Sequence, residues 1–76
     1  MLAAPTGRKL LAGLIGAGIQ RSLSPAMHEE EARHHGFRLH YQLIDLDSYH
    51  ANVESLPALL AAARMMDFAG LNITYP

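Results

Sequence analysis

The 76-residue chain contains no cysteine, and neither sign of charge dominates its composition. Without cysteine it has no disulfide to stabilise a small core and no thiolate cluster to bind a metal, which fits a reducing compartment. Seven acidic against six basic residues give a formal net charge of -1. No strong field of one sign therefore attracts nucleic acid or acidic membranes, and we expect a cytoplasmic protein without a nucleic-acid partner.

A long hydrophobic segment is also missing from the chain. The longest apolar stretch, Leu10 to Ile15, is far too short to span a bilayer. The opening residues, Met1 to Pro5, lack the positive charge and the long apolar region of a secretory leader. No repeat or low-complexity stretch divides the sequence, so we expect one domain, or part of one, with no membrane segment. The oligomeric state stays open.

Strand-like and helix-like segments alternate along the chain. Half of the residues are apolar, which indicates that a core is formed. Periodicity and turn residues predict strands over residues 9–15, 39–44 and 70–74, and helices over residues 25–35 and 55–66. Gly36 suits the left-handed residue that closes the first helix. The order strand, helix, strand, helix, strand predicts an α/β fold with a parallel sheet and right-handed crossovers.

Two serines precede the first predicted helix. Ser24 before Pro25 is typical of a helix start, in which the serine side chain caps free backbone N–H groups. Ser22 and Ser24 together also place two hydroxyls beside a helix N-terminus, an arrangement that favours a carboxylate or a similar anion. The residues leave both interpretations open: a simple cap, or a site for a small acid.

Asn72 and Thr74 lie where the third predicted strand ends. Ligands of parallel α/β sheets bind beyond the carboxyl ends of the strands, and Ser22 and Ser24 follow the first strand at that same end. We therefore expect the two segments to face one pocket, in which an amide and a hydroxyl are suited to a polyol. The alternative is that both side chains only tie down a turn.

Three glycines, Gly13, Gly16 and Gly18, invite a dinucleotide-binding interpretation, because glycine lets a backbone approach a pyrophosphate closely. The spacing argues against it. Arg21 stands where a third small residue should let helix and strand pack, and the helix begins only near Pro25. We favour a tight turn that carries a binding loop, and we assign no cofactor-binding residue.

The histidines raise the alternative of a metal site. They are His28, His34, His35, His40 and His50. Of these, His28 and His35 would share a face of the predicted helix, but two turns apart rather than the usual one, and no partner completes a ligand set. We expect no bound metal. Met65, Met66 and Phe68 are expected to pack the domain rather than to form an adaptable ligand surface.

Three segments carry a family resemblance in their order and spacing. They are residues 13–16 (Gly-Leu-Ile-Gly), 22–28 (Ser-Leu-Ser-Pro-Ala-Met-His) and 70–76 (Gly-Leu-Asn-Ile-Thr-Tyr-Pro). Together they resemble the N-terminal domain of the shikimate dehydrogenase family. The resemblance implies that residues 1–76 are the N-terminal part of its substrate-binding domain, and that the cofactor-binding domain is absent from this chain.

The resemblance also implies roles for single residues. Ser22, Ser24 and Thr74 would bind the substrate, chiefly its carboxylate, while Asn72 would support the turn more than touch the substrate. The catalytic lysine of the family lies two residues beyond the motif's proline, and its aspartate partner lies further on. Both positions fall after Pro76, so no catalytic residue is assigned here.

The implied reaction is the reversible oxidation of shikimate to 3-dehydroshikimate, or the equivalent step on quinate, with NADP or NAD bound by the missing domain. Ser24 favours shikimate, because relatives that accept quinate can carry threonine at that position. The sequence of residues 71–76 resembles the mixed quinate/shikimate and shikimate-dehydrogenase-like branches of the family more than the biosynthetic enzyme. A non-catalytic small-acid binding or interaction module is the alternative.

Overall fold

The computed structural model describes residues 9–74 of the chain. Along the sequence they form strand β1 (Lys9–Gly16), helix α1 (Ser24–His34), strand β2 (Arg38–Asp45), the 3₁₀ turns η1 (Asp47–Tyr49) and η2 (Val53–Ser55), helix α2 (Leu56–Met65) and strand β3 (Gly70–Ile73). This order and the parallel pairing of the strands confirm the α/β prediction. The third strand ends at Ile73, one residue earlier than expected.

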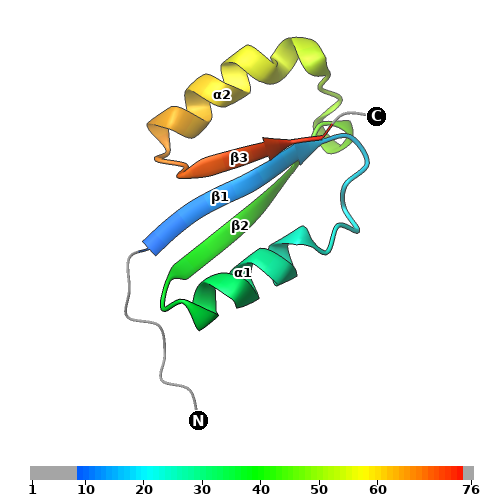
Figure 1. The fold of residues 1–76 in the computed structure, drawn as a ribbon. Helices are drawn as coiled ribbons and strands as arrows, with labels where there is room; N and C mark the ends of the chain where they lie inside the picture. Colours follow the sequence, from blue (N-terminus) through cyan, green and yellow to red (C-terminus); the bar gives the residue numbers. More distant parts are fainter. Residues whose placement is uncertain (1–8, 75–76) are drawn as a thin grey trace.

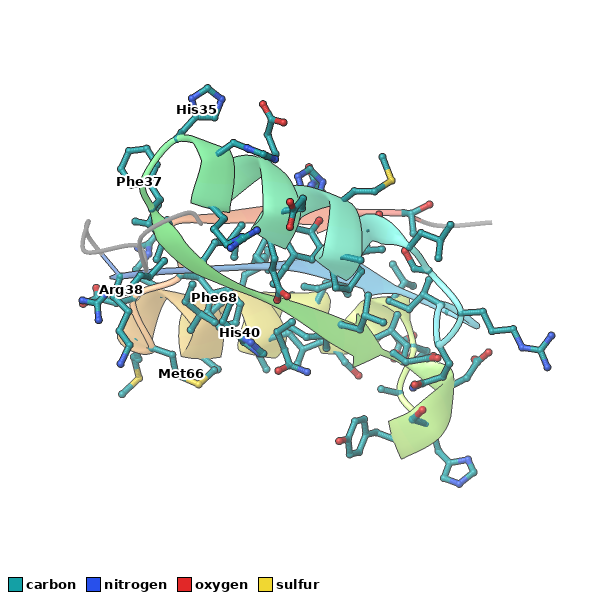
Figure 2. The ribbon with its side chains drawn as sticks, turned by 90° about the horizontal axis from the view of Figure 1, so that it is seen from below. His35, Phe37, Arg38, His40, Met66 and Phe68 are labelled. Atoms are coloured by element: carbon teal, nitrogen blue, oxygen red, sulfur yellow. The ribbon has the colours of Figure 1, made fainter. Side chains whose placement is uncertain are left out.

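The sheet has the strand order β2-β1-β3, with β1 in the centre. β1 is central because it is the most apolar strand, and its Ile15 is fully buried. Since β2 and β3 pair with opposite edges of β1, crossovers of one hand carry the two helices to opposite faces. Figure 1 and Figure 2 show α1 on one side of the sheet and α2 on the other.

The carboxyl ends of the three strands meet at one end of the molecule (Figure 1). There Gly16 pairs with Asp45 of β2, and Ile15 pairs with Ile73 of β3. The backbone N–H of Thr74 continues the β3 pairing by donating to the Ile15 carbonyl oxygen at 2.9 Å. The loop that joins β1 to α1, residues 17–23, begins at this same end, so it lies beside the end of β3.

The two ends of α1 differ in how well the sequence predicts them. At the C-terminus Gly36 has φ +79°, as expected for the residue that closes the helix. At the N-terminus the cap position is Leu23, and no side chain caps the helix. The prediction that Ser24 caps α1 is therefore wrong: Ser24 is the first helical residue, and its N–H donates to Ser22 instead.

α2 follows the predicted apolar stripe, with Pro57 in its first turn and Ala63 buried. Phe68 packs beneath β1, since a side chain built on Gly13 would lie 3.1 Å from its ring. Met65 and Met66 are 88% and 56% exposed, so the expectation that they pack the domain is wrong. The helix ends at Met65, and Figure 2 shows Met66 at the surface near that end of α2, on the side of the sheet away from α1.

None of the helices found within residues 9–74 is long and apolar enough to cross a membrane. The residues on which the absence of a secretory leader was argued, Met1 to Pro5, lie outside the described part of the chain. The last two residues of the third motif, Tyr75 and Pro76, lie outside it as well.

Candidate functional site

The site is organised around Gly16, the buried last residue of β1. A Cβ atom at this position would lie 2.6 Å from Thr74 Cγ2, 2.9 Å from the Thr74 carbonyl oxygen and 3.0 Å from Ile19 Cγ2. Two segments distant in sequence therefore converge over this glycine: the start of the β1–α1 loop and the residue that follows β3. Glycine is required here because it permits that close approach.

Ser22 and Ser24 are brought directly together by the β1–α1 loop. Ser22 N–H donates to the Ile19 carbonyl oxygen at 2.9 Å, which closes a turn, and Ser24 N–H donates to Ser22 Oγ at 3.1 Å. Both serines are half-buried, at the N-terminus of an 11-residue helix. Each hydroxyl carries a proton that it can donate, so the pair suits an acceptor-only ligand group such as a carboxylate.

Thr74 and Asn72 reach the site from β3 in different ways. Thr74 is exposed at the surface beside Ile19, and its backbone N–H is held by β1. Asn72 lies two residues earlier, and its side-chain Nδ2 donates to the Tyr41 hydroxyl at 2.9 Å. The hydrogen bond that the structure gives Asn72 thus runs across the sheet to β2, whereas support of the turn was expected.

Tyr41 of β2 belongs to this arrangement as well. Its ring stacks on His28 of α1, with ring centroids 4.5 Å apart and an interplanar angle of 17°. Its backbone N–H donates to Glu29 Oε2 at 2.8 Å. Tyr41 therefore links α1, β2 and Asn72 on one face of the sheet.

Asp45 is the functional candidate that sequence reasoning missed. Only 3% of it is exposed, yet the structure gives its carboxylate three backbone donors. Oδ1 accepts from Gly18 N–H and from Asp47 N–H, both at 3.0 Å, and Oδ2 accepts from Ile19 N–H at 3.1 Å. The signal in the sequence is an acidic residue at the end of the second strand.

The charge state of Asp45 follows from these contacts. Burial alone raises the pKa of the Asp45 carboxyl, but the N–H groups of Gly18, Asp47 and Ile19, with the Gln20 side chain, outweigh it and leave the pKa below its ordinary value. The group is therefore a carboxylate at neutral pH. It places a negative charge against the β1–α1 loop.

The same contacts test the dinucleotide interpretation of the glycines. A pyrophosphate needs free N–H groups at a glycine turn that leads directly into a helix. Here the N–H groups of Gly18 and Ile19 already donate to Asp45, and α1 begins only at Ser24. The loop does not fit a dinucleotide.

The histidines make surface contacts. His34 and His35 pair with Glu30 and Glu31 one turn earlier on α1, at 3.2 Å and 3.0 Å. Within residues 9–74, no three His, Asp or Glu side chains lie close enough together to hold a metal ion.

Shallow hollows also occur along α2 and the β3 edge, lined mainly by Leu60, Arg64, Phe68 and Leu71. Their lining is more apolar than polar, with Arg64 and Asp67 as its charged residues. Hydroxyls, backbone N–H groups and a buried charge converge instead at the carboxyl ends of the strands, so we take that edge as the candidate site.

Comparison with known proteins identifies the class to which this fold and site belong. The family described as the shikimate dehydrogenase substrate binding domain matches residues 14–76, and the chain belongs to this family. The match includes the serine pair, Asn72 and Thr74.

Among the individual relatives, some are named for shikimate and NADP(+), and others for quinate or shikimate and NAD(+). The chain is 54% identical over 66 residues to the shikimate dehydrogenase (NADP(+)) of Streptomyces avermitilis, covering 87% of the chain and 23% of that protein. It is 48% identical over 67 residues to the quinate/shikimate dehydrogenase (NAD(+)) of Corynebacterium efficiens, covering 88% and 24%. A solved structure, quinate dehydrogenase from Corynebacterium glutamicum in complex with NAD, superimposes with a TM-score of 0.82 at 43% identity, covering 92% of this chain and 25% of that one. The chain thus spans about a quarter of the length of these relatives.

Proposed function

We propose that this chain supplies part of the substrate carboxylate pocket of an NAD(P)-dependent shikimate or quinate dehydrogenase. It would form the N-terminal part of the substrate-binding domain of a cytoplasmic enzyme. The observation that carries the proposal is that the β1–α1 loop meets β3 at the carboxyl ends of the strands: Ile19 and Thr74 approach each other over Gly16, and Ile19 holds the turn that brings Ser22 and Ser24 together.

In this proposal the hydroxyls of Ser22, Ser24 and Thr74 donate hydrogen bonds to the substrate carboxylate. Hydrogen bonds to a charged acceptor are stronger than neutral ones, and the N-terminus of α1 adds a favourable dipole. Asn72 contributes less directly, because its amide already donates to Tyr41. Its part is to keep β3 in register beside the site.

These residues bind and orient the substrate, and they perform no bond-making step. When bound, the nicotinamide supplies the hydride acceptor for oxidation of a ring carbinol. Fixing the carboxylate at one end of the ring sets where that carbinol lies, and orientation of this kind can supply a large part of a rate enhancement. We expect the proton-transferring lysine, its aspartate partner and the cofactor-binding residues in the part of the protein that follows Pro76.

The choice between substrates rests on Ser24. Relatives that accept quinate can carry threonine at this position, and this chain carries serine, so we propose shikimate as the preferred substrate. Quinate is the main alternative substrate, because the names of some relatives include it.

The test is a spectrophotometric assay of the full-length protein that contains this chain, with shikimate and quinate each offered NAD and NADP. Reduced nicotinamide should appear, with the higher kcat/KM for shikimate. A clear preference for quinate would overturn the role given to Ser24 and leave the reaction class intact. No turnover with any pairing, together with calorimetric binding of shikimate, would replace the enzyme with a small-acid binding module.

A further inference from the structure

Asp45 is a buried ionised group to which the proposed binding role assigns no task. It ends β2 directly opposite Gly16, the residue around which the site is organised. Three backbone N–H groups donate to its two oxygens, and two of them belong to the β1–α1 loop. A buried carboxylate with no task in binding is costly unless its hydrogen bonds hold something in place.

A continuous chain of hydrogen bonds connects this carboxylate with both serines. Asp45 Oδ2 accepts from Ile19 N–H at 3.1 Å. The Ile19 carbonyl oxygen then accepts from Ser22 N–H at 2.9 Å, and Ser22 Oγ accepts from Ser24 N–H at 3.1 Å. Each link holds the residue that forms the next one, so the position of Asp45 is passed on to the two serines.

A second contact joins the same two segments. Gln20 Nε2 donates to Ser48 Oγ at 2.8 Å, which ties the middle of the loop to η1. Gly18, with φ +67°, makes the bend that turns the N–H groups of the loop toward Asp45. The loop is therefore held from β2 and η1, elements that contribute no residue to the proposed binding set.

We propose that Asp45 is a positioning residue for Ser22 and Ser24: its carboxylate fixes the β1–α1 loop so that both serine hydroxyls are preorganised for the substrate carboxylate. The inference rests on the function proposed above. It adds a residue that touches neither substrate nor cofactor and acts only through the backbone of residues 18–24.

The chemistry of the three donors requires a carboxylate at this position. An ionised aspartate is acceptor-only and can satisfy every N–H that faces it. An asparagine of the same shape would turn an NH₂ group toward one of these N–H donors and leave that N–H unsatisfied. A glutamate keeps both oxygens on a longer side chain, so it should restore part of the arrangement.

The test compares Asp45→Asn with Asp47→Asn in the full-length protein. Both changes remove one carboxylate, but Asp47 has an exposed side chain, and only its backbone N–H donates to Asp45. For Asp45→Asn we expect KM for shikimate to rise on the order of 10-fold, as misplacement of positioning groups commonly does, with KM for the nicotinamide unchanged. Asp47→Asn should match the wild type, and Asp45→Glu should recover part of the loss.

Hydrogen–deuterium exchange provides a readout that needs no activity. In Asp45→Asn the amides of residues 17–23 should exchange faster, while those of β1 stay protected. The proposal would be overturned if the loop exchanged equally fast in Asp45→Asn and Asp47→Asn. It would also be overturned if Asp45→Asn raised KM for the nicotinamide as much as KM for shikimate. If Asp45→Asn does not fold, Ser48→Ala, which removes the Gln20 contact alone, should show the same pattern more weakly. An inactive wild type would refute the proposed dehydrogenase, and the exchange result would still decide whether Asp45 holds the loop.

Discussion

The starts of the two helices look alike in sequence and are built differently. Each has a serine close to a proline: Ser24-Pro25 at α1, and Ser55 two residues before Pro57 at α2. Neither helix has a side-chain cap of its own. In the η2 turn that leads into α2, however, the polar side chains bond to their own turn, because Asn52 Oδ1 accepts from Glu54 N–H at 2.9 Å and Ser55 Oγ accepts from Asn52 N–H at 3.5 Å.

At α1 no side chain caps the helix, and the loop before it is held by Asp45, from another strand. In the α1 loop Ser22 Oγ also accepts a local bond, from Ser24 N–H, but both serine hydroxyls keep a proton that they can donate to a ligand. We therefore assign the α1 start to binding and the α2 start to structure.

The largest effect should come from removing the space in which the α1 loop and β3 meet. In Gly16→Ala the new methyl group would contact Thr74 backbone and side-chain atoms at less than van der Waals distance. Overpacking of this kind costs about 1–3 kcal/mol in the free energy of unfolding, and it should also displace Thr74 and raise KM for shikimate. Thermal unfolding and steady-state kinetics of the full-length protein measure both.

Gly70→Ala is the matched control for this change, since a Cβ at Gly70 would meet nothing within 4 Å. It should leave both stability and KM close to those of the wild type. If Gly16→Ala behaved like Gly70→Ala, the site would not depend on the approach of Thr74 to Gly16.

A narrower effect, on either substrate binding or stability but not on both, should separate Ser24 of α1 from Ser55 before α2. Ser24→Ala should remove a hydrogen bond to a charged ligand group, worth about 1.5–3 kcal/mol, and so raise KM for shikimate by roughly 10-fold or more. It should leave the melting temperature nearly unchanged, because Ser24 does not cap the helix.

Ser55→Ala should do the reverse: it removes the hydrogen bond that Ser55 Oγ accepts from Asn52 N–H, which should lower the free energy of unfolding by about 0.5–1 kcal/mol with KM unchanged. The measurements are melting curves and initial rates on the two purified variants. A loss of stability in Ser24→Ala with no change in KM would return that serine to a structural role.

The smallest expected effect concerns Asp45, the carboxylate that holds the loop before α1. It is absent at neutral pH and develops only in acid. Because the folded-state pKa of Asp45 lies below the ordinary value of 3.8, its stabilising contribution is complete above that value and is lost as the pH falls through the folded-state pKa. Below about pH 4 the amides of residues 17–23 should therefore lose protection before those of residues 52–55.

Hydrogen exchange across pH, corrected for the intrinsic rate, measures this difference. In Asp45→Asn the acid-dependent step should disappear, because the variant has no proton to bind there, whereas Asp47→Asn should keep it. Loss of protection at the same pH in both segments would show that the two helix starts are held in the same way.

Much of the fold was predictable from the sequence because its signals are local. The apolar run before Gly16, the apolar spacing from Leu56 to Met66, and Gly36 each report on their own segment, and the structure bears out all three. The Met65 and Met66 prediction failed because periodicity does not say where a helix ends relative to the sheet.

The candidate site was only partly accessible in the same way. Ser22, Ser24 and Thr74 could be selected because they follow strands that share a carboxyl edge. Asp45 could not, since an acidic residue after a strand has the same local pattern whether it enters solvent or turns inward. Its three donors come from another segment as well as from its own, and only the pairing of β2 with β1 brings them together.

By itself, the sequence determined the order of elements, the parallel sheet and the family motifs, because residue periodicity, turn glycines and motif spacing act over a few positions. The tertiary structure decided that neither Ser24 nor Ser55 caps its helix, why Gly16 must be glycine, and that the glycine loop does not fit a dinucleotide. Those properties depend on atoms that are distant in sequence and meet at hydrogen-bond or van der Waals distance, and only the folded chain sets those distances.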